Sequence, residues 1–316
     1  MTPSSDGAAV PRFVDAATLA RALPMRAAID ALERAFREQD LGALPLRSHL
    51  ATPAGTLLTM PAAGAAGAGV KIVTLSPENA ARGLPFLHAV YVLFDPHTQA
   101  PEAVIDGAAM TSLRTAAVSG LATRHLAIPD AHRLVIFGAG VQAEVHLEAM
   151  RAVRPVDQVV IVSRSPARAD ALVARARREG LASRTGTPTD IESADLVCTC
   201  TTSPAPVFDG LGLPQGAHVN AVGAYTPDTR EVDSETVRRA RVVVEDRAVT
   251  LAEAGDLLIP IGEGVITAAH VLADLAEVVR DARAVRGSLD DVTLFESVGM
   301  AFEDLVVARA VMEALT

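Results

Sequence analysis

The chain has 316 residues, of which 50% are hydrophobic and 21% are charged. This length and composition allow roughly two ordinary globular domains, each with its own core. A formal net charge of -10 argues against a nucleic-acid groove, because neutralising phosphates needs a surplus of Lys and Arg on one face. The first residues lack the basic head and apolar run of a secretory signal, and no apolar stretch approaches the roughly 18 to 20 residues of a membrane span. We therefore expect a cytoplasmic protein with no membrane partner.

The only two cysteines of the sequence, Cys198 and Cys200, lie in the apolar run ADLVCTCTT. Two such residues can build neither a disulfide framework nor a four-ligand metal site. We expect them to be small core residues, and we expect no metal.

The N-terminal part predicts helices around a set of strands. Residues 23–41 repeat apolar side chains at helical spacing, with Gly42 as the expected C-cap. The tract PAAGAAGAG, residues 61–69, is expected to be a mobile loop, because its residues are too small to pack. A second helix is predicted over residues 108–126. Between the helices, β-rich runs separated by turn residues predict an antiparallel meander: TLLTM, VKIVTL, HAVYVLF and EAVID.

From Arg133 onward, apolar strands alternate with helical patterns. Helices are expected after Val141, Pro166 and Asp233, and a short strand with a closing helix is expected at the C-terminus. Continuous Val/Ile runs between helices are typical of a parallel sheet covered on both faces. The predicted strands are RLVIF, QVVIV, ADLVCTC, AHVNAV and ARVVVE.

The first of these strands runs into Gly138-Ala139-Gly140-Val141-Gln142-Ala143, a GxGxxA pattern. The pattern alone is a weak signal, but a strand before it and a helix after it are its proper context. Gly138 would permit the turn, and Gly140 would let a pyrophosphate approach the backbone. Val141 and Gln142 would offer the amides of the helix N-terminus to that anion. A glycine turn without a nucleotide is the alternative.

The second strand ends in Ser163, Arg164 and Ser165, where an NAD-specific site would place an acidic residue for the ribose 2'-hydroxyl. A guanidinium between two hydroxyls instead suits a 2'-phosphate, with Arg168 as a helper. We therefore favour NADP(H) over NAD(H). The alternative is that Arg164 is an ordinary solvated side chain.

With these motifs in place, the chain resembles the ornithine cyclodeaminase/mu-crystallin family of NAD(P)-dependent enzymes over nearly its whole length. The resemblance implies an α/β fold: a Rossmann doubly wound parallel sheet over residues 127–295, and an α+β substrate-binding and dimerisation domain from residues 1–126 plus a closing helix at about 296–316. It also implies a homodimer. The motifs occur in the family's order: LPLRSHL, TMPA, GVKIVTL, VLFDPHT, VIDGAAMTSLRTAAVSGLATRHLA, VIFGAGVQA, HVNAVGAYTPDTREVD and TLFESVGMAFEDLVVA.

By this resemblance, Arg47, Lys71 and Arg114 match substrate-binding positions of the family. Three cations brought together would repel one another unless an anion such as an α-carboxylate lies between them. The alternative is that each forms a surface ion pair. Asp304, in GMAFEDL, could stand near this site or could cap or pair structurally. The positions that match cofactor contacts are Thr201, Val219, Asn220, Ala221 and Val222.

Two departures from the cyclodeaminase pattern bear on the reaction. Leu58 stands where that pattern has a glutamate, two positions before the Met-Pro pair, and residues 223–228, GAYTPD, lack the carboxylate at its acid/base position. The segment GAYTPDTREVD is instead similar to the mu-crystallin-like and pyrroline-carboxylate reductase branch. Cyclodeamination of ornithine to proline and ammonia is thereby disfavoured.

The expected function is NAD(P)H-dependent reduction of a small cyclic 2-imino carboxylate, such as pyrroline-2-carboxylate or piperideine-2-carboxylate. Arg47 and Arg114 would clamp the carboxylate. Lys71 would supply the proton, with a pKa lowered by the two neighbouring guanidinium groups. The alternatives are ornithine cyclodeaminase, an alanine dehydrogenase-like enzyme, and an NADP-dependent ligand-binding protein without turnover.

Overall fold

The computed structural model describes residues 10–38, 45–64, 66–281 and 285–316. It divides into two compact units, Met1–Arg114 with Met300–Thr316, and Thr115–Gly299. The sequence-based boundaries lay after residues 126 and 295 instead. The first of them coincides with the end of helix α3 (Gly107–Leu126), which contributes residues to both units.

The first unit contains a six-stranded sheet with the order β1-β6-β5-β4-β3-β2. Strands β2 to β6 form an antiparallel meander, of which β3 to β6 were predicted, and β1 pairs with β6 in parallel. The sequence analysis did not predict β1 and β2. The strand bounds are Arg12–Val14 (β1), Ser48–Thr52 (β2), Gly55–Gly64 (β3), Gly67–Leu75 (β4), Leu87–Phe94 (β5) and Pro101–Asp106 (β6).

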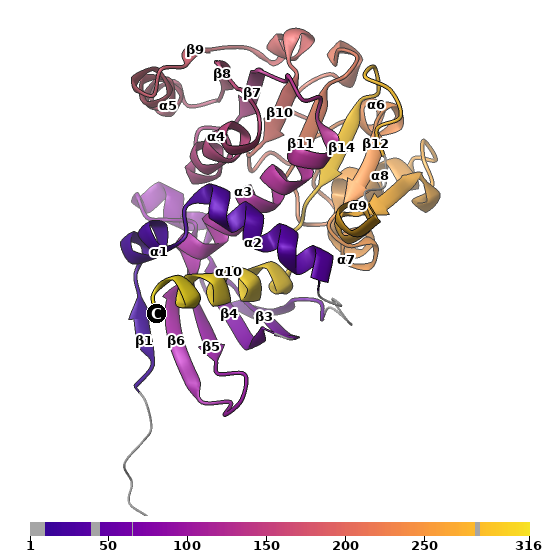
Figure 1. Ribbon diagram of the computed structural model, residues 1–316. Coiled ribbons are helices and arrows are strands. Elements are labelled where there is room, and N and C mark those ends of the chain that lie inside the picture. The colour runs from indigo at the N-terminus through magenta and orange to yellow at the C-terminus, as the bar shows by residue number, and fades with distance from the viewer. Residues whose placement is uncertain (1–9, 39–44, 65, 282–284) are drawn as a thin grey trace, which may run out of the picture. The chain divides into compact units, whose positions relative to one another are not determined.

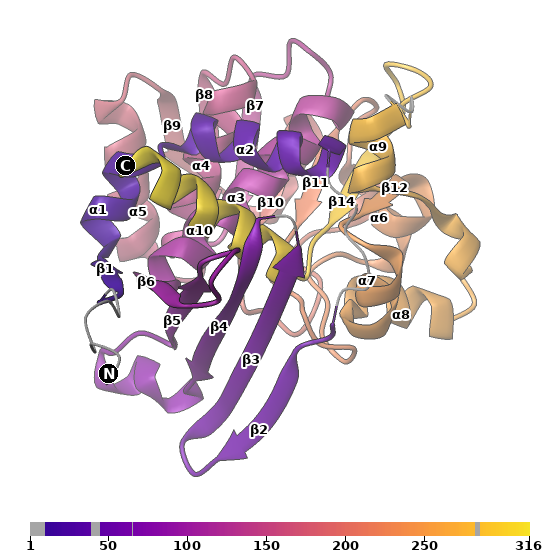
Figure 2. The same cartoon turned by 60° about the horizontal axis from the view of Figure 1, so that its bottom comes forward.

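Helix α10 (Ala301–Ala314) packs against β3, β4, β5 and the predicted amphipathic helix α2 (Met25–Glu38). The two helices lie side by side over this sheet in Figures 1 and 2. The rings of Phe36 and Phe302 meet edge to face with their centroids 5.5 Å apart. The apolar stripe of α2 is thus buried, as its spacing predicted, whereas Gly42 lies outside the described residues. A short helix α1 (Ala16–Ala22) precedes α2.

The predicted mobile loop over residues 61–69 is wrong, because most of this tract belongs to the β3–β4 hairpin. The two strands pair in register to Gly64 opposite Gly67. A Cβ at Gly69 would lie 2.2 Å from the hydroxyl oxygen of Tyr91 on β5. The small residues therefore make room for a large neighbour, a reason that the tract alone does not reveal.

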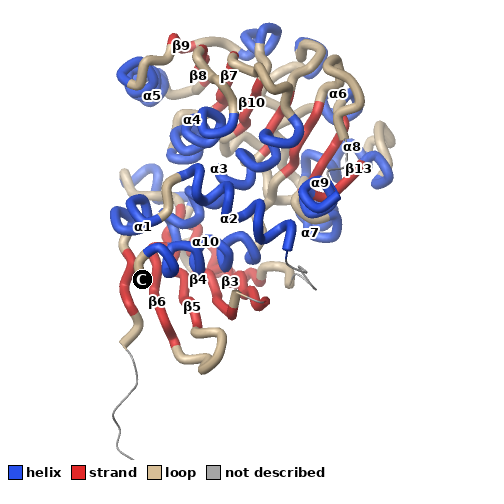
Figure 3. Tube along the Cα trace, in the orientation of Figure 1, coloured by secondary structure: helices blue, strands red, loops and turns tan. Residues whose placement is uncertain are grey.

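The second unit contains an eight-stranded sheet with the order β13-β12-β14-β11-β10-β7-β8-β9, and all of its pairings are parallel. Strands β8 and β9 lie on one side of β7, and β10 and β11 lie on the other, so the predicted doubly wound α/β fold is confirmed. Figure 3 shows these strands in red. Their bounds are Arg133–Phe137 (β7), Gln158–Val162 (β8), Ala182–Thr185 (β9), Leu196–Thr199 (β10), His218–Ala221 (β11), Arg241–Val244 (β12), Val271–Asp274 (β13) and Thr293–Glu296 (β14).

The helices of this unit follow their strands. The expected helices after Val141, Pro166 and Asp233 are all present, whereas β9, β13 and the helices α7, α8 and α9 were not predicted. No helix among the described residues is both long and apolar enough to cross a membrane. The helix bounds are Val141–Val153 (α4), Pro166–Arg178 (α5), Ser234–Arg239 (α6), Arg247–Glu253 (α7), Gly255–Gly262 (α8) and Leu275–Asp281 (α9).

Candidate functional site

The turn between β7 and α4 can only be made by glycine. Gly138 has φ of +110°, a conformation that side chains rarely adopt, and its N–H donates to the carbonyl oxygen of Val162 at 2.8 Å. A Cβ here would lie 2.4 Å from the carbonyl oxygen of Cys200, just after β10. The turn therefore lies between β7 and β10, where the strand order reverses and doubly wound sheets bind their ligands.

The N-terminus of α4 is open to a ligand. Gly140 is its N-cap and offers no side-chain cap, and no atom lies within 4 Å of the place that its Cβ would occupy. Val141, the first helical residue, is 61% exposed, and Gln142 follows it. Ala143, which replaces the third glycine of the fingerprint, is fully buried. Free amides, the helix dipole and an unfilled space beside the backbone together fit a pyrophosphate.

Two arginines follow β8, one in the connecting segment and one in the first turn of α5. Ser165 is the N-cap of α5, and its N–H donates to the hydroxyl of Ser163 at 3.2 Å. Arg164 and Arg168 are exposed, and neither has an ion-pair partner among the residues that the structure describes. Two guanidinium groups beside a helix N-terminus fit a phosphate, and no acidic side chain occupies residues 163–165.

The predicted cofactor residues at the end of β11 differ in where their side chains lie. Val219 belongs to the hydrophobic core, as does Ala221, and Asn220 is fully buried and donates to the hydroxyl of Thr123 at 3.0 Å. A cofactor contact from Val219 or Asn220 would therefore have to come from the main chain. Val222, beyond the strand end, is half-buried.

Thr201, just beyond β10, is held by a residue that the sequence analysis did not single out. Its N–H and its hydroxyl both donate to Oε1 of Glu231, at 2.7 and 2.5 Å. Glu231 stands within GAYTPDTREVD, so the motif was recognised but the role of this glutamate was not.

In the first unit, two of the three predicted substrate-binding cations lie in one buried cluster. Nζ of Lys71 lies 2.7 Å from Oδ2 of Asp304 and donates to Oδ1 at 3.0 Å. Arg114 donates from Nε to Oδ1 of Asp304 at 3.2 Å and from Nη1 to Oε2 of Glu303 at 3.1 Å. Arg47 immediately precedes β2 and is near enough to lower the pKa of Lys71.

This cluster corrects the expectation that only a bound anion could hold the cations together. Asp304 and Glu303, both on α10, are fully buried and supply two negative charges. Lys71 and Arg114 can therefore lie close together here without a bound anion. The position of Asp304 beside Lys71 was left open by the sequence, because its partner lies far away along the chain.

Burial lowers the pKa of the Lys71 ammonium to about 8. The charge of Asp304 opposes this shift, and Arg114 and Arg47 add to it. The predicted direction is thus confirmed, but its largest cause is desolvation and not the guanidinium groups. Lys71 is only 1% exposed. A lysine with this pKa is still largely protonated at pH 7 and can give up its proton readily.

On the six-stranded sheet, the side chains of β3 that neighbour Lys71 are apolar. Met60 lies directly opposite Lys71 across the β3–β4 pairing, and Leu58 is buried on the same face of β3. Leu58 is the position at which the cyclodeaminase pattern has its glutamate. At position 58, this face of the sheet therefore carries an apolar side chain and not a carboxylate.

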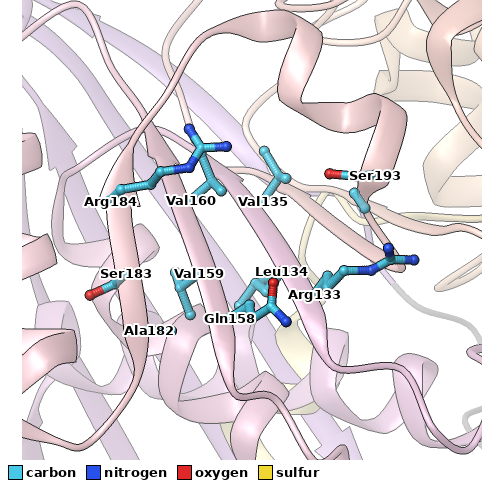
Figure 4. Close-up of a pocket in the computed structure, with 11 residues that line it drawn as sticks. Arg133, Leu134, Val135, Gln158, Val159, Val160, Ala182, Ser183, Arg184 and Ser193 are labelled. Carbon is cyan, nitrogen blue, oxygen red and sulfur yellow. The ribbon is translucent and has the colours of Figure 1, made fainter.

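A hollow of about 310 Å³ opens at the other end of the Rossmann strands (Figure 4). It is lined by the first three residues of β7, β8 and β9, with Ser193 and Ala194, whereas a dinucleotide binds at the carboxyl ends of such strands. Its two arginines are already paired, Arg133 with Asp195 at 2.7 Å and Arg184 with Asp190. We therefore do not assign this hollow to the cofactor. Over the described ranges, no group of metal-ligating side chains gathers.

Comparison with known proteins agrees with this geometry. The model of the ornithine cyclodeaminase/mu-crystallin family matches residues 10–316. A Delta(1)-pyrroline-2-carboxylate reductase of Bacillus cereus (strain ZK / E33L) is 36% identical over 282 residues, which cover 85% of each chain. Among solved structures, the Delta(1)-pyrroline-2-carboxylate reductase of Thermococcus litoralis, in complex with NADH and L-proline, has a TM-score of 0.90 and 34% identity, with 96% of this chain and 97% of that chain covered.

An archaeal alanine dehydrogenase dimer with bound NAD has the same TM-score. Its TM-score is 0.90 at 30% identity, and the match covers 96% of this chain and 95% of that chain. The family model spans both units, and it includes the glycine turn of β7 and the cation cluster of β4, α3 and α10. This chain belongs to the ornithine cyclodeaminase/mu-crystallin family.

Proposed function

We propose that this chain is an NAD(P)H-dependent reductase of a small cyclic 2-imino carboxylate, such as pyrroline-2-carboxylate or piperideine-2-carboxylate. The observation that carries the proposal is the buried cluster of Lys71, Arg114 and Asp304, which offers a proton donor beside a cationic group. The reductases of Bacillus cereus and Thermococcus litoralis support the same substrate class.

The reaction adds one hydride and one proton to a C=N bond. The reduced nicotinamide supplies the hydride to the imine carbon when it is bound. Arg47 and Arg114 bind the carboxylate by charge-assisted hydrogen bonds, which fixes the orientation of the imine. The ammonium of Lys71 donates its proton to the imine nitrogen, so the product is a cyclic amino acid. Asp304 orients the ammonium through its hydrogen bond to Nζ.

The cofactor is proposed to be NADP(H), with NAD(H) as the alternative. Gly138 and Gly140 would receive the pyrophosphate, and Arg164 and Arg168 would bind a 2'-phosphate. The two similar solved structures contain NADH and NAD, so the preference must be measured for this chain.

A second candidate, oxidation or formation of an open-chain amino acid, is favoured by the similarity to the alanine dehydrogenase. A panel of cyclic imines, oxo acids with ammonia, and amino acids, each assayed with both cofactors, separates the two. We expect loss of NADPH absorbance with the cyclic imines. Release of ammonia from ornithine would indicate a cyclodeaminase, and cofactor binding without any turnover would indicate a ligand carrier.

We also propose that two copies of the chain pair through the open face of the six-stranded sheet. This face is opposite to the one that α10 covers and carries exposed apolar side chains on separate strands, including Phe13 at 68%, Leu50 at 63% and Val90 at 41%. An open sheet face with several exposed apolar side chains is a candidate association site. Light scattering should give the mass of a dimer for the wild type and of a monomer for Val90→Asp. The control Leu211→Asp, on an exposed apolar residue of the second unit, should stay dimeric.

A further inference from the structure

A buried carboxylate ties together the ends of two neighbouring strands of the Rossmann sheet. Glu231 is fully buried. Its Oε1 accepts the N–H and hydroxyl of Thr201, beyond β10, and its Oε2 accepts the N–H of Gly223, beyond β11, at 2.6 Å. This single side chain therefore links the two loops through three hydrogen bonds.

Glu231 is itself held in place by the helix that follows. Oδ1 of Asp256, at the start of α8, accepts the N–H groups of Glu231 and Val232, both at 2.8 Å. A Cβ at Gly255 would lie 2.0 Å from the carbonyl oxygen of Thr229, so only glycine lets the helix approach so closely. The main chain that carries Glu231 therefore has little freedom to move.

The two loops also touch directly. A Cβ at Gly223 would lie 2.2 Å from the carbonyl oxygen of Thr201 and 2.5 Å from Oε2 of Glu231. The loop after β10 in turn borders the dinucleotide turn, because the carbonyl oxygen of Cys200 faces Gly138. A shift of Glu231 would therefore be transmitted to the edge at which the cofactor is proposed to bind.

We infer that Glu231 is a positioning residue that sets the spacing of the loops after β10 and β11, and thereby sets the affinity for the nicotinamide dinucleotide. The inference rests on the proposed function. It does not require Glu231 to touch the cofactor. A carboxylate accepts hydrogen bonds at both oxygens, whereas a glutamine would present an NH₂ group to one of the N–H donors, and that link would be lost.

The test is the variant Glu231→Gln, with dissociation constants for NADPH and NADH measured by fluorescence titration, alongside the melting temperature. We expect about tenfold weaker binding, as for the loss of one hydrogen bond. KM for the dinucleotide should rise by a similar factor, whereas KM for the imino acid should change little. Burial raises the pKa of Glu231. The neutral Glu231→Gln variant therefore need not have a lower melting temperature, and the dissociation constants are the deciding quantity.

Thr201→Val, which removes one of the bonds to Glu231, serves as a second variant. It should weaken binding by a smaller factor, and combining it with Glu231→Gln should give less than the product of the two effects. Asp195→Asn is the matched control, because Asp195 also accepts two main-chain N–H groups, those of His132 and Arg133, but at the amino ends of the same sheet. It should lower the melting temperature and leave both dissociation constants unchanged.

A folded Glu231→Gln variant that binds dinucleotide as tightly as the wild type would overturn the inference and leave the proposed function standing. Equal weakening by Asp195→Asn would overturn it too, because the effect would then be one of general stability. If Glu231→Gln does not fold, Glu231→Asp, whose shorter side chain cannot reach both loops in the same way, decides by the same comparison. A wild type that binds neither dinucleotide would overturn the proposed function itself.

Discussion

Lys71 and Asp304 are 233 positions apart in the sequence, yet Nζ of Lys71 lies 2.7 Å from a carboxylate oxygen of Asp304. Strand β4 carries the lysine and the closing helix α10 carries the aspartate. Both groups are buried, and without Lys71 the carboxylate of Asp304 would keep the guanidinium of Arg114 as its ionic partner. The closing helix is thus part of the proposed active site as well as of the core.

The pH dependence of the reaction should report the proton donor. Lys71 must be protonated to act as the acid, and its pKa is lowered to about 8. We expect kcat/KM for imine reduction to be constant at lower pH and to fall as the pH rises through about 8. Lys71→Met should lower kcat by about 10²- to 10⁴-fold and remove this limb, while NADPH binding is unchanged. Undiminished turnover of Lys71→Met would contradict the role of Lys71 as the proton donor.

Asp304→Asn should move the same limb to lower pH. The charge of Asp304 raises the pKa of Lys71, so its removal lets burial and the guanidinium groups lower that pKa further. The measurement is the pH–rate profile of Asp304→Asn, compared with that of the wild type. Glu313→Gln, at an exposed position of the same helix, is the control and should leave the limb in place. An unshifted limb in Asp304→Asn would show that another group donates the proton.

Arg164→Ala should raise KM for NADPH by about 10- to 100-fold and leave KM for NADH nearly unchanged, because it removes charge-assisted hydrogen bonds to the 2'-phosphate only. Steady-state kinetics with both cofactors measure this. Arg178→Ala, an exposed arginine in the last turn of the same helix α5, should affect neither constant. Equal losses with NADPH and NADH would argue against a 2'-phosphate contact.

Gly69→Ala should destabilise the first unit by about 1 to 3 kcal/mol, the usual cost of overpacking, because its Cβ would collide with Tyr91. Chemical denaturation measures the free energy of unfolding. Gly64→Ala lies in the same hairpin with no atom within 4 Å of its Cβ, so it should change that free energy by no more than about 0.5 kcal/mol. Equal effects of the two substitutions would be evidence that the hairpin is not packed as described.

Asp256 should make stability depend on pH. Burial raises its pKa from 3.8 to about 7, so the folded state holds this proton more tightly than the unfolded state does. The stabilisation is fully present below about pH 4 and is lost as the pH rises through about 7. Asp256→Asn cannot ionise and keeps an oxygen acceptor for the two N–H groups. The melting temperature of Asp256→Asn minus that of the wild type should therefore increase between pH 5 and pH 8. A difference that stays constant over this range would refute the raised pKa of Asp256.

The elements that depend only on residues adjacent in the sequence were predictable. The turn at Gly138 needs a strand before it, a helix after it and a residue without a side chain, and all three are readable within residues 133–153. The long apolar strands of both units and helix α2 were found for the same reason, since their spacing alone determines which face is buried. Strand β1 was missed because its three residues carry too little pattern, and β13 because its apolar run continues directly into helix α9.

What the amino-acid sequence by itself determined is therefore the α/β fold, the dinucleotide turn and the residue types available to a substrate. Only the tertiary structure decided which partners those residues have. The small residues near Gly69 fit because Tyr91 arrives from another strand, Lys71 has its pKa because it is buried against Asp304, and Glu231 links two loops that adjoin only in the sheet. Packing and electrostatic interactions depend on distance in space, and distance along the chain does not specify it.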